Sequence, residues 1–134
     1  MFVATLLSIG SIVIGVLGLL HLIYTFATDK FEPRDQNLGG QLRHVSPVIS
    51  KETTVWKAWI GFNASHSLGA LLFAAVFGYL AMFELEFLLA SKFLVATSLV
   101  VLVSYLVLAR KFWFKIPFAG IAASTALFVA GYVT

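Results

Sequence analysis

Cysteine is absent from the sequence, which excludes disulfide bonds, thiolate metal sites and thiol nucleophiles. Charge is scarce as well, because Asp, Glu, Lys and Arg make up only 11% of the 134 residues, against about 25% in an average soluble protein. Hydrophobic residues account for 60% of the chain and include 13 phenylalanines, too many to hide in so small a soluble core. The composition therefore predicts a protein embedded in a lipid bilayer.

Four long apolar stretches predict an all-α fold, a polytopic membrane protein built as an up-and-down bundle of four transmembrane helices. We place these helices at about 3–27, 51–83, 88–109 and 113–133, with a polar connection at 28–50 and a very short turn around 84–86, in a single transmembrane domain of residues 1–134. The first stretch lacks a preceding basic region and a following small-residue cleavage pattern. It is therefore predicted to be a retained helix rather than a signal peptide.

Local patterns predict how the helices begin and pack. Ser50 is a good N-cap residue for the second helix, with Glu52 in its first turn. Four apolar residues of the polar connection fall at helical spacing and predict a short interfacial amphipathic segment: Leu38, Leu42, Val45 and Ile49. Small residues in the first and last helices predict close approach of neighbouring helices: Ser8, Ser11, Gly15 and Gly18, then Gly120, Ala123, Ser124 and Gly131.

The basic residues predict the orientation of the chain in the membrane. Of the nine Lys and Arg residues, eight lie in or beside the first and third connections, and only Lys92 lies on the opposite side. Under the positive-inside rule, the connections 28–50 and 110–116 are cytoplasmic and both termini lie outside. Because the net charge of +3 resides in these short connections, we expect no nucleic-acid partner.

A polar cluster interrupts the second helix at Asn63, Ser65, His66 and Ser67. Polar side chains are costly inside a bilayer and need a partner or a function there. His21 lies about 12 Å along the first helix from its cytoplasmic end, and His66 lies about 13 Å along the second helix, in the opposite direction. Two antiparallel neighbours would therefore hold their imidazoles at matching depth, in the cytoplasmic half of the bilayer.

Several functions are open for this cluster. Pockets for small molecules are mostly apolar with a few placed polar groups, so the cluster and the nearby phenylalanines Phe62, Phe73 and Phe77 predict binding of a lipid-like or quinone-like headgroup. The candidate ligand-binding residues are His21, Thr25, Trp59, Asn63, His66 and Ser67. Alternatively, these side chains bond to one another and lock the helices together, in a structural or accessory subunit of a membrane complex.

A b-type haem with His21 and His66 as axial ligands is a third hypothesis, because the two imidazoles match in depth. The pair is similar to that of four-helix quinone-reactive cytochrome subunits, although no further motif matches. No carboxylate accompanies the histidines inside the membrane, which disfavours a metal-dependent or acid–base enzyme. No charge within the helices marks an ion path, which disfavours a transporter.

Two segments also carry a family resemblance: Gly18–Leu22 (GLLHL) and Thr53–Gly69 (TTVWKAWIGFNASHSLG). With them, the chain resembles a family of small, functionally uncharacterised bacterial four-helix integral membrane proteins, over nearly its whole length. The resemblance implies four helices and a multi-pass location in the bacterial inner membrane. It implies no reaction, cofactor or ligand, so the expected partners are membrane lipids, a second copy of the chain or a larger membrane complex.

Overall fold

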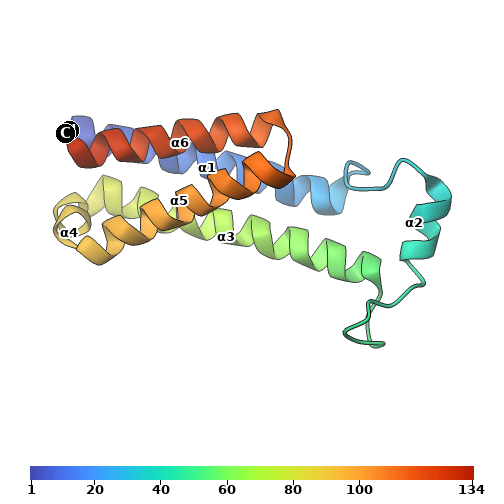
Figure 1. Cartoon of the computed structure of the whole chain (residues 1–134). Coiled ribbons are helices and arrows are strands. Elements are labelled where there is room, and N and C mark those ends of the chain that lie inside the picture. Colours follow the sequence, from blue (N-terminus) through green and yellow to red (C-terminus); the bar gives the residue numbers. More distant parts are fainter. The chain divides into compact units, whose positions relative to one another are not determined.

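The computed structural model describes all residues from Met1 to Thr134, and its regular structure is entirely helical. Four helices are long and apolar enough to cross a membrane: α1 (Phe2–Ala27), α3 (Val55–Phe83), α5 (Lys92–Phe112) and α6 (Lys115–Val133). Two short helices lie in the connections, α2 (Gln36–Leu42) and α4 (Leu85–Ala90) (Figure 1). The predicted all-α, four-helix membrane fold is confirmed.

The chain forms two compact units, and each is described by itself. The first unit consists of residues 1–17 and 70–134, and so contains the first part of α1, the last part of α3, and all of α4, α5 and α6. The second unit consists of residues 18–69, which are the last part of α1, the polar connection with α2, and the first part of α3. The first unit is a bundle of helices, and the second carries the polar cluster.

Small residues set the distance between α1 and α3 in the first unit. A Cβ atom added to Gly15 would lie 3.1 Å from the Cβ of Ala74, and one added to Gly78 would lie 3.4 Å from the Cβ of Ser11. The residue numbers rise along α1 as they fall along α3, so these helices are antiparallel. Close approach at Ser11 and Gly15 is confirmed as the role of this small-residue stripe.

Helix α6 lies antiparallel to α1 in the same unit. Gly131 packs against Leu7, and Gly10 packs against the ring of Phe128. One turn before Phe128 in α6, the hydroxyl of Ser124 donates a hydrogen bond of 2.9 Å to the backbone carbonyl of Gly10. The predicted small-residue edge of the last helix therefore brings two backbones close enough for a side chain of one helix to bond the main chain of the other.

Phe128 lies at the centre of the apolar core of the first unit, with none of its surface exposed. Its ring centroid is 5.5 Å from that of Phe73 and 6.2 Å from that of Phe77. At 5.9 Å lies the ring of Tyr132, whose hydroxyl shares a hydrogen bond of 2.8 Å with the hydroxyl of Ser98 on α5. These ring contacts leave Phe128 little freedom to move, since protein cores are packed at crystal-like density.

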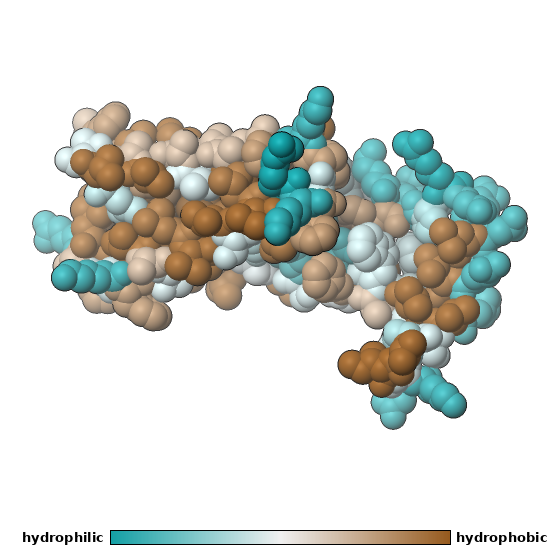
Figure 2. Space-filling model, in the orientation of Figure 1, coloured by the Kyte–Doolittle hydropathy of each residue, from teal (hydrophilic) through white to brown (hydrophobic).

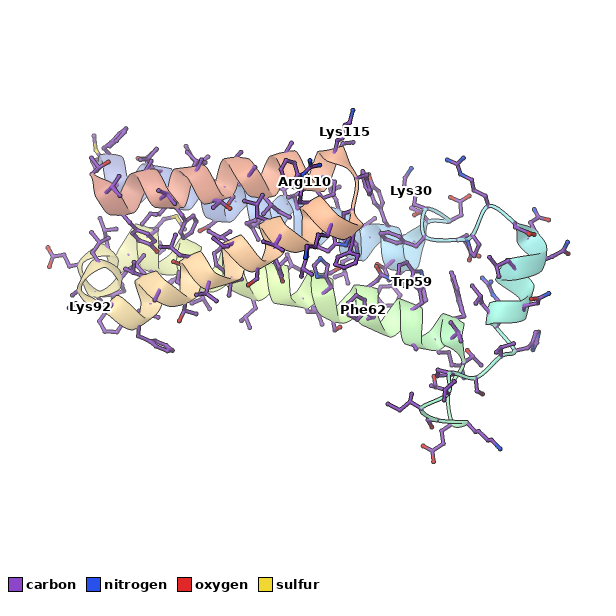
Figure 3. All side chains as sticks on the ribbon, viewed as in Figure 1. Lys30, Trp59, Phe62, Lys92, Arg110 and Lys115 are labelled. Carbon is purple, nitrogen blue, oxygen red and sulfur yellow. The ribbon has the colours of Figure 1, made fainter.

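The outer surface of the first unit is apolar, as a bilayer requires. Large side chains are exposed on all four helices, among them Ile12, Leu72, Val100 and Val129. Figure 2 shows this surface as a mostly brown region with polar residues at its ends. In Figure 3, Arg110 and Lys115 lie at one end of the unit and Lys92 at the other. The protein is therefore a multi-pass membrane protein.

Helix α3 begins later than predicted, and the prediction that Ser50 caps it is wrong. The N–H of Val55 donates to the carbonyl of Val45 at 2.9 Å, instead of to a residue four positions earlier, so the helix cannot extend backward. The Thr54 hydroxyl accepts a backbone N–H of the first turn at 3.2 Å and acts as the cap. Ser50 instead closes a separate turn with the N–H of Glu52, at 3.1 Å.

The connection after α3 also differs from the prediction. Where we expected a very short turn and a third helix from about residue 88, the chain forms α4 and then starts α5 at Lys92. Ser91 separates the two helices, because its extended backbone ends α4 and its hydroxyl accepts the N–H of Leu94 at 3.3 Å. Serine is among the best N-cap residues, which explains this break in an otherwise apolar stretch.

The amphipathic segment of the polar connection is shorter than predicted. Helix α2 is capped by the Asp35 carboxylate, which accepts the N–H of Asn37 at 2.9 Å, and it ends at Leu42. Val45 and Ile49, which we expected to continue the helical stripe, lie in the irregular chain that follows. Pro47 has no N–H to donate and disfavours a helical conformation at the residue before it. The helix therefore does not continue through Val45 and Ile49.

The contact between Gly10 and Phe128 generates a prediction about stability. A Cβ at Gly10 would lie 2.8 Å from a ring carbon of the fully buried Phe128. Gly10→Ala should therefore lower stability in a mild detergent by about 1–3 kcal/mol, seen as a lower melting temperature. Gly61→Ala is the matched control, because a Cβ there meets nothing within 4 Å. That variant should melt with the wild type or slightly above it, since alanine favours the helix. Equal melting temperatures for the two variants would refute the account of this helix contact.

Candidate functional site

Two helix segments of the second unit build the polar cluster. Helix α1 supplies His21 and Thr25, and α3 supplies the other four candidate residues: Trp59, Asn63, His66 and Ser67. The ring centroids of His21 and His66 lie 5.2 Å apart, with the rings tilted by 69° in an edge contact. The sequence predicted only a matching depth for the two histidines; the structure brings their rings into contact, and both side chains are half-buried.

Asn63 lies behind the histidine pair and is only 5% exposed. Its Nδ2 group donates to the backbone carbonyl of Trp59, one turn earlier in α3, at 2.8 Å. Its Oδ1 atom lies 2.9 Å from Nε2 of His21. A carbonyl oxygen can only accept, so the NH₂ group must face Trp59 and the oxygen must face His21. The buried amide is therefore bonded at both ends and joins α3 to α1.

This arrangement decides which nitrogen of His21 carries the hydrogen. Because Oδ1 of Asn63 is an acceptor, Nε2 of His21 must be the donor in this bond. In the neutral imidazole the other nitrogen, Nδ1, then holds a lone pair and can only accept. The partner of one ring nitrogen thus fixes the role of the other, as it commonly does in functional histidines.

Thr25 and Ser67 are buried, and each bonds back to its own helix. The Thr25 hydroxyl donates to the carbonyl of His21 at 2.8 Å, and the Ser67 hydroxyl donates to the carbonyl of Asn63 at 2.9 Å. Both bonds run to the residue four positions earlier, which satisfies a hydroxyl inside a membrane helix without a second helix. These two residues brace the backbone beneath the histidine and the asparagine, and their hydroxyl hydrogens are occupied.

Phe31 joins the cluster from the polar connection, and sequence reasoning did not identify it. Its ring centroid lies 4.7 Å from that of His21 and 6.3 Å from that of Trp59. The indole N–H of Trp59 donates to the backbone carbonyl of Phe31 at 3.3 Å. In Figure 3, Trp59 lies on the side of α3 nearest the connection that carries Lys30. The pair of Phe31 and Trp59 covers the His21 ring with aromatic surface.

Arg43 holds the same connection in place and was also missed. Its guanidinium forms an ion pair of 2.6 Å with Glu32, next to Phe31, and donates to the Gly39 carbonyl at 3.0 Å. The same group lies 4.3 Å from the ring of Trp56 at the start of α3, within the range of a cation–π contact. The role of Arg43 is hard to predict from the sequence, because two of its three partners are distant along the chain and the third is the backbone of a nearby glycine.

The phenylalanines expected around the cluster divide between the two units. Phe62 lies on α3 in the second unit and is 66% exposed (Figure 3). Phe73 and Phe77 instead belong to the core around Phe128 in the first unit. Within the second unit, the aromatic side chains nearest to His21 are therefore supplied by the connection and the first turns of α3, through Phe31 and Trp59.

The geometry does not fit a haem held by His21 and His66. An axial ligand must offer a nitrogen lone pair to the iron, and His21 has one only at Nδ1, because its Nε2 group donates to Asn63. A porphyrin would also have to lie between the two rings, which touch edge to face. No group of three or more His, Asp or Glu side chains converges to hold a metal ion.

Comparisons of the sequence with protein-family models and with characterised proteins, and of the structure with solved structures, give no significant match.

Proposed function

We propose that the protein binds a lipid-like or quinone-like amphipathic molecule at the histidine pair. The observation that carries this proposal is the contact of two half-buried imidazoles from different membrane helices, one of which is oriented by a buried amide. Binding sites commonly hold their polar groups in one orientation through supporting hydrogen bonds, even where this lowers the stability of the fold. The surrounding apolar and aromatic surface suits the hydrocarbon part of such a ligand.

A purely structural role is the second candidate, and the bonding of Asn63 favours it. Both ends of its amide are bonded inside the protein, as expected of an interhelical lock in an accessory subunit of a membrane complex. In our proposal the structural role and the ligand-binding role belong to different residues. Asn63 ties α1 to α3 and positions His21, while His21 and His66 meet the ligand.

The proposed setting is the bacterial inner membrane, in agreement with the family that the sequence resembles. The connections at 28–50 and 110–116 would face the cytoplasm and both termini the outside, which puts the histidines in the cytoplasmic leaflet. Support comes from the eight basic residues in or beside these two connections. Membrane lipids are then the immediate partners, and a second copy or a larger complex would supply any protein contact.

Orientation can be tested by thiol labelling, because the chain has no cysteine. Asn37→Cys places a thiol on the exposed surface of α2, and Glu86→Cys places one on the exposed surface of α4, beyond the opposite end of α3. In spheroplasts a membrane-impermeant maleimide should label Glu86→Cys at once and Asn37→Cys only after the membrane is permeabilised. The reverse pattern would invert the proposed topology and place the histidine pair in the outer leaflet.

The choice between ligand site and lock can be tested with His66→Leu. Melting temperatures are measured in detergent, with and without a bacterial polar-lipid extract or a short-chain ubiquinone supplied in its reduced form. Wild type should be stabilised by about 2.7 kcal/mol when the free ligand is about 100 times its Kd. His66→Leu should melt near wild type without ligand and show no gain with either probe, since binding at the pair is lost.

His44→Leu is the matched control, because this histidine is exposed on the polar connection. It should keep the full response of the wild type to the probes. If His66→Leu responds as wild type does but melts well below it without ligand, His66 is a structural lock. The ligand-site proposal would then be abandoned in favour of the accessory-subunit role.

A further inference from the structure

The polar groups that α1 contributes to the cluster have their hydrogens committed inside the protein. The Nε2 hydrogen of His21 goes to Oδ1 of Asn63 at 2.9 Å. The hydroxyl hydrogen of Thr25 goes to the backbone carbonyl of His21 at 2.8 Å. Helix α1 can therefore offer a ligand only hydrogen-bond acceptors, which are the lone pairs at Nδ1 of His21 and at the Thr25 oxygen. Since Thr25 is buried, Nδ1 of the half-buried His21 is the accessible one of the two.

This assignment describes the neutral imidazole, in which Nε2 carries the hydrogen and Nδ1 the lone pair. His21 contacts Phe31, Asn63 and His66, and none of these three side chains is acidic. As long as the amide of Asn63 holds the Nε2 hydrogen, Nδ1 of the neutral ring is an acceptor.

We infer that the ligand of this site carries a hydroxyl group, which donates a hydrogen bond to Nδ1 of His21; this rests on the proposed function. A group with carbonyl acceptors only, such as an oxidised quinone ring, finds no donor on α1. A hydroxyl on an apolar chain has two common sources in a membrane: the reduced, hydroquinone form of a quinone, and a glycerolipid with a free hydroxyl. The chemistry they share is an O–H donor attached to a lipid tail.

The chemistry at Nδ1 also sets what the site should reject. Replacing the ligand hydroxyl hydrogen by a methyl group removes the donor and presents an ether oxygen to a nitrogen lone pair. The bond is lost and Nδ1, now covered by the bound ligand, is left without a partner, which typically lowers affinity by about tenfold. A site that recognises only the hydrocarbon tail would not distinguish the two compounds, because they differ only by the methyl groups on the oxygens.

The test compares two matched pairs of probes on the wild-type protein by titration calorimetry in detergent. One pair is decylhydroquinone, kept reduced under anaerobic conditions, and its dimethyl ether. The other is a monoacylglycerol and its dimethyl ether. We expect the hydroxyl compound of at least one pair to bind about tenfold more tightly than its ether. The pair that shows the preference identifies the source of the hydroxyl.

Variants attribute the preference to His21. His21→Phe keeps a ring beside Phe31 but removes Nδ1, so the ratio of the two affinities should fall to about one. His44→Phe, on the exposed connection, should leave the ratio unchanged. Equal affinity of hydroxyl compound and ether for the wild type, or a tenfold preference that survives in His21→Phe, would overturn this inference alone. Failure of all four compounds to bind the wild type would instead contradict the proposed function, and the inference with it.

Discussion

The hydrogen bond between Nε2 of His21 and Oδ1 of Asn63 is the interaction on which the candidate site depends. Its geometry is fixed from both sides, because the other end of the amide is held by the Trp59 carbonyl. In hydrocarbon there is no water to replace a lost partner, so the bond is costly to break. Through it, α3 determines both the position of an α1 side chain and the chemical character of that side chain.

The bilayer also explains how the other polar groups of the spanning helices are arranged. Ser11, Thr25 and Ser67 each donate to the carbonyl four residues earlier, which satisfies them within one helix. Ser124 bonds across to Gly10, and no buried side-chain polar atom in the structure lacks a partner. Against this background of satisfied hydroxyl groups, a pair of imidazoles in contact stands out as a feature that packing alone does not require.

Much of this organisation could be predicted from the sequence, because a bilayer imposes simple rules. Helix number follows from apolar length, and the matching depth of His21 and His66 follows from counting residues back from the polar connection. Helix starts were less predictable, since Ser50 and Ser91 are equally good capping residues and only one of them starts a long helix. The competing bond of Val55 with Val45 decided the first case, and such a contact between distant residues leaves no local pattern.

The missed site residues have the same cause. Phe31 and Arg43 lie in a polar connection with no periodicity, and their roles come from tertiary contacts with His21, Trp59 and Trp56. Thr25 and Ser67 were expected to bind ligand because Thr25 lies near the same side of its helix as His21 and Ser67 borders the face that carries Asn63 and His66. Sequence could place them in the cluster, but whether a hydroxyl turns to its own helix depends on rotamers that spacing does not reveal.

The most direct test of this account is a ¹⁵N spectrum of protein labelled at histidine, which has only three such residues to resolve. The signals of His21 are assigned by their loss in His21→Phe. The account predicts that His21 carries its hydrogen on Nε2 and a lone pair on Nδ1, and that Asn63→Leu, which removes the partner, abolishes this fixed state. A hydrogen on Nδ1, or a wild-type ring exchanging between the two forms, would contradict the central claim that Asn63 sets the chemistry of His21.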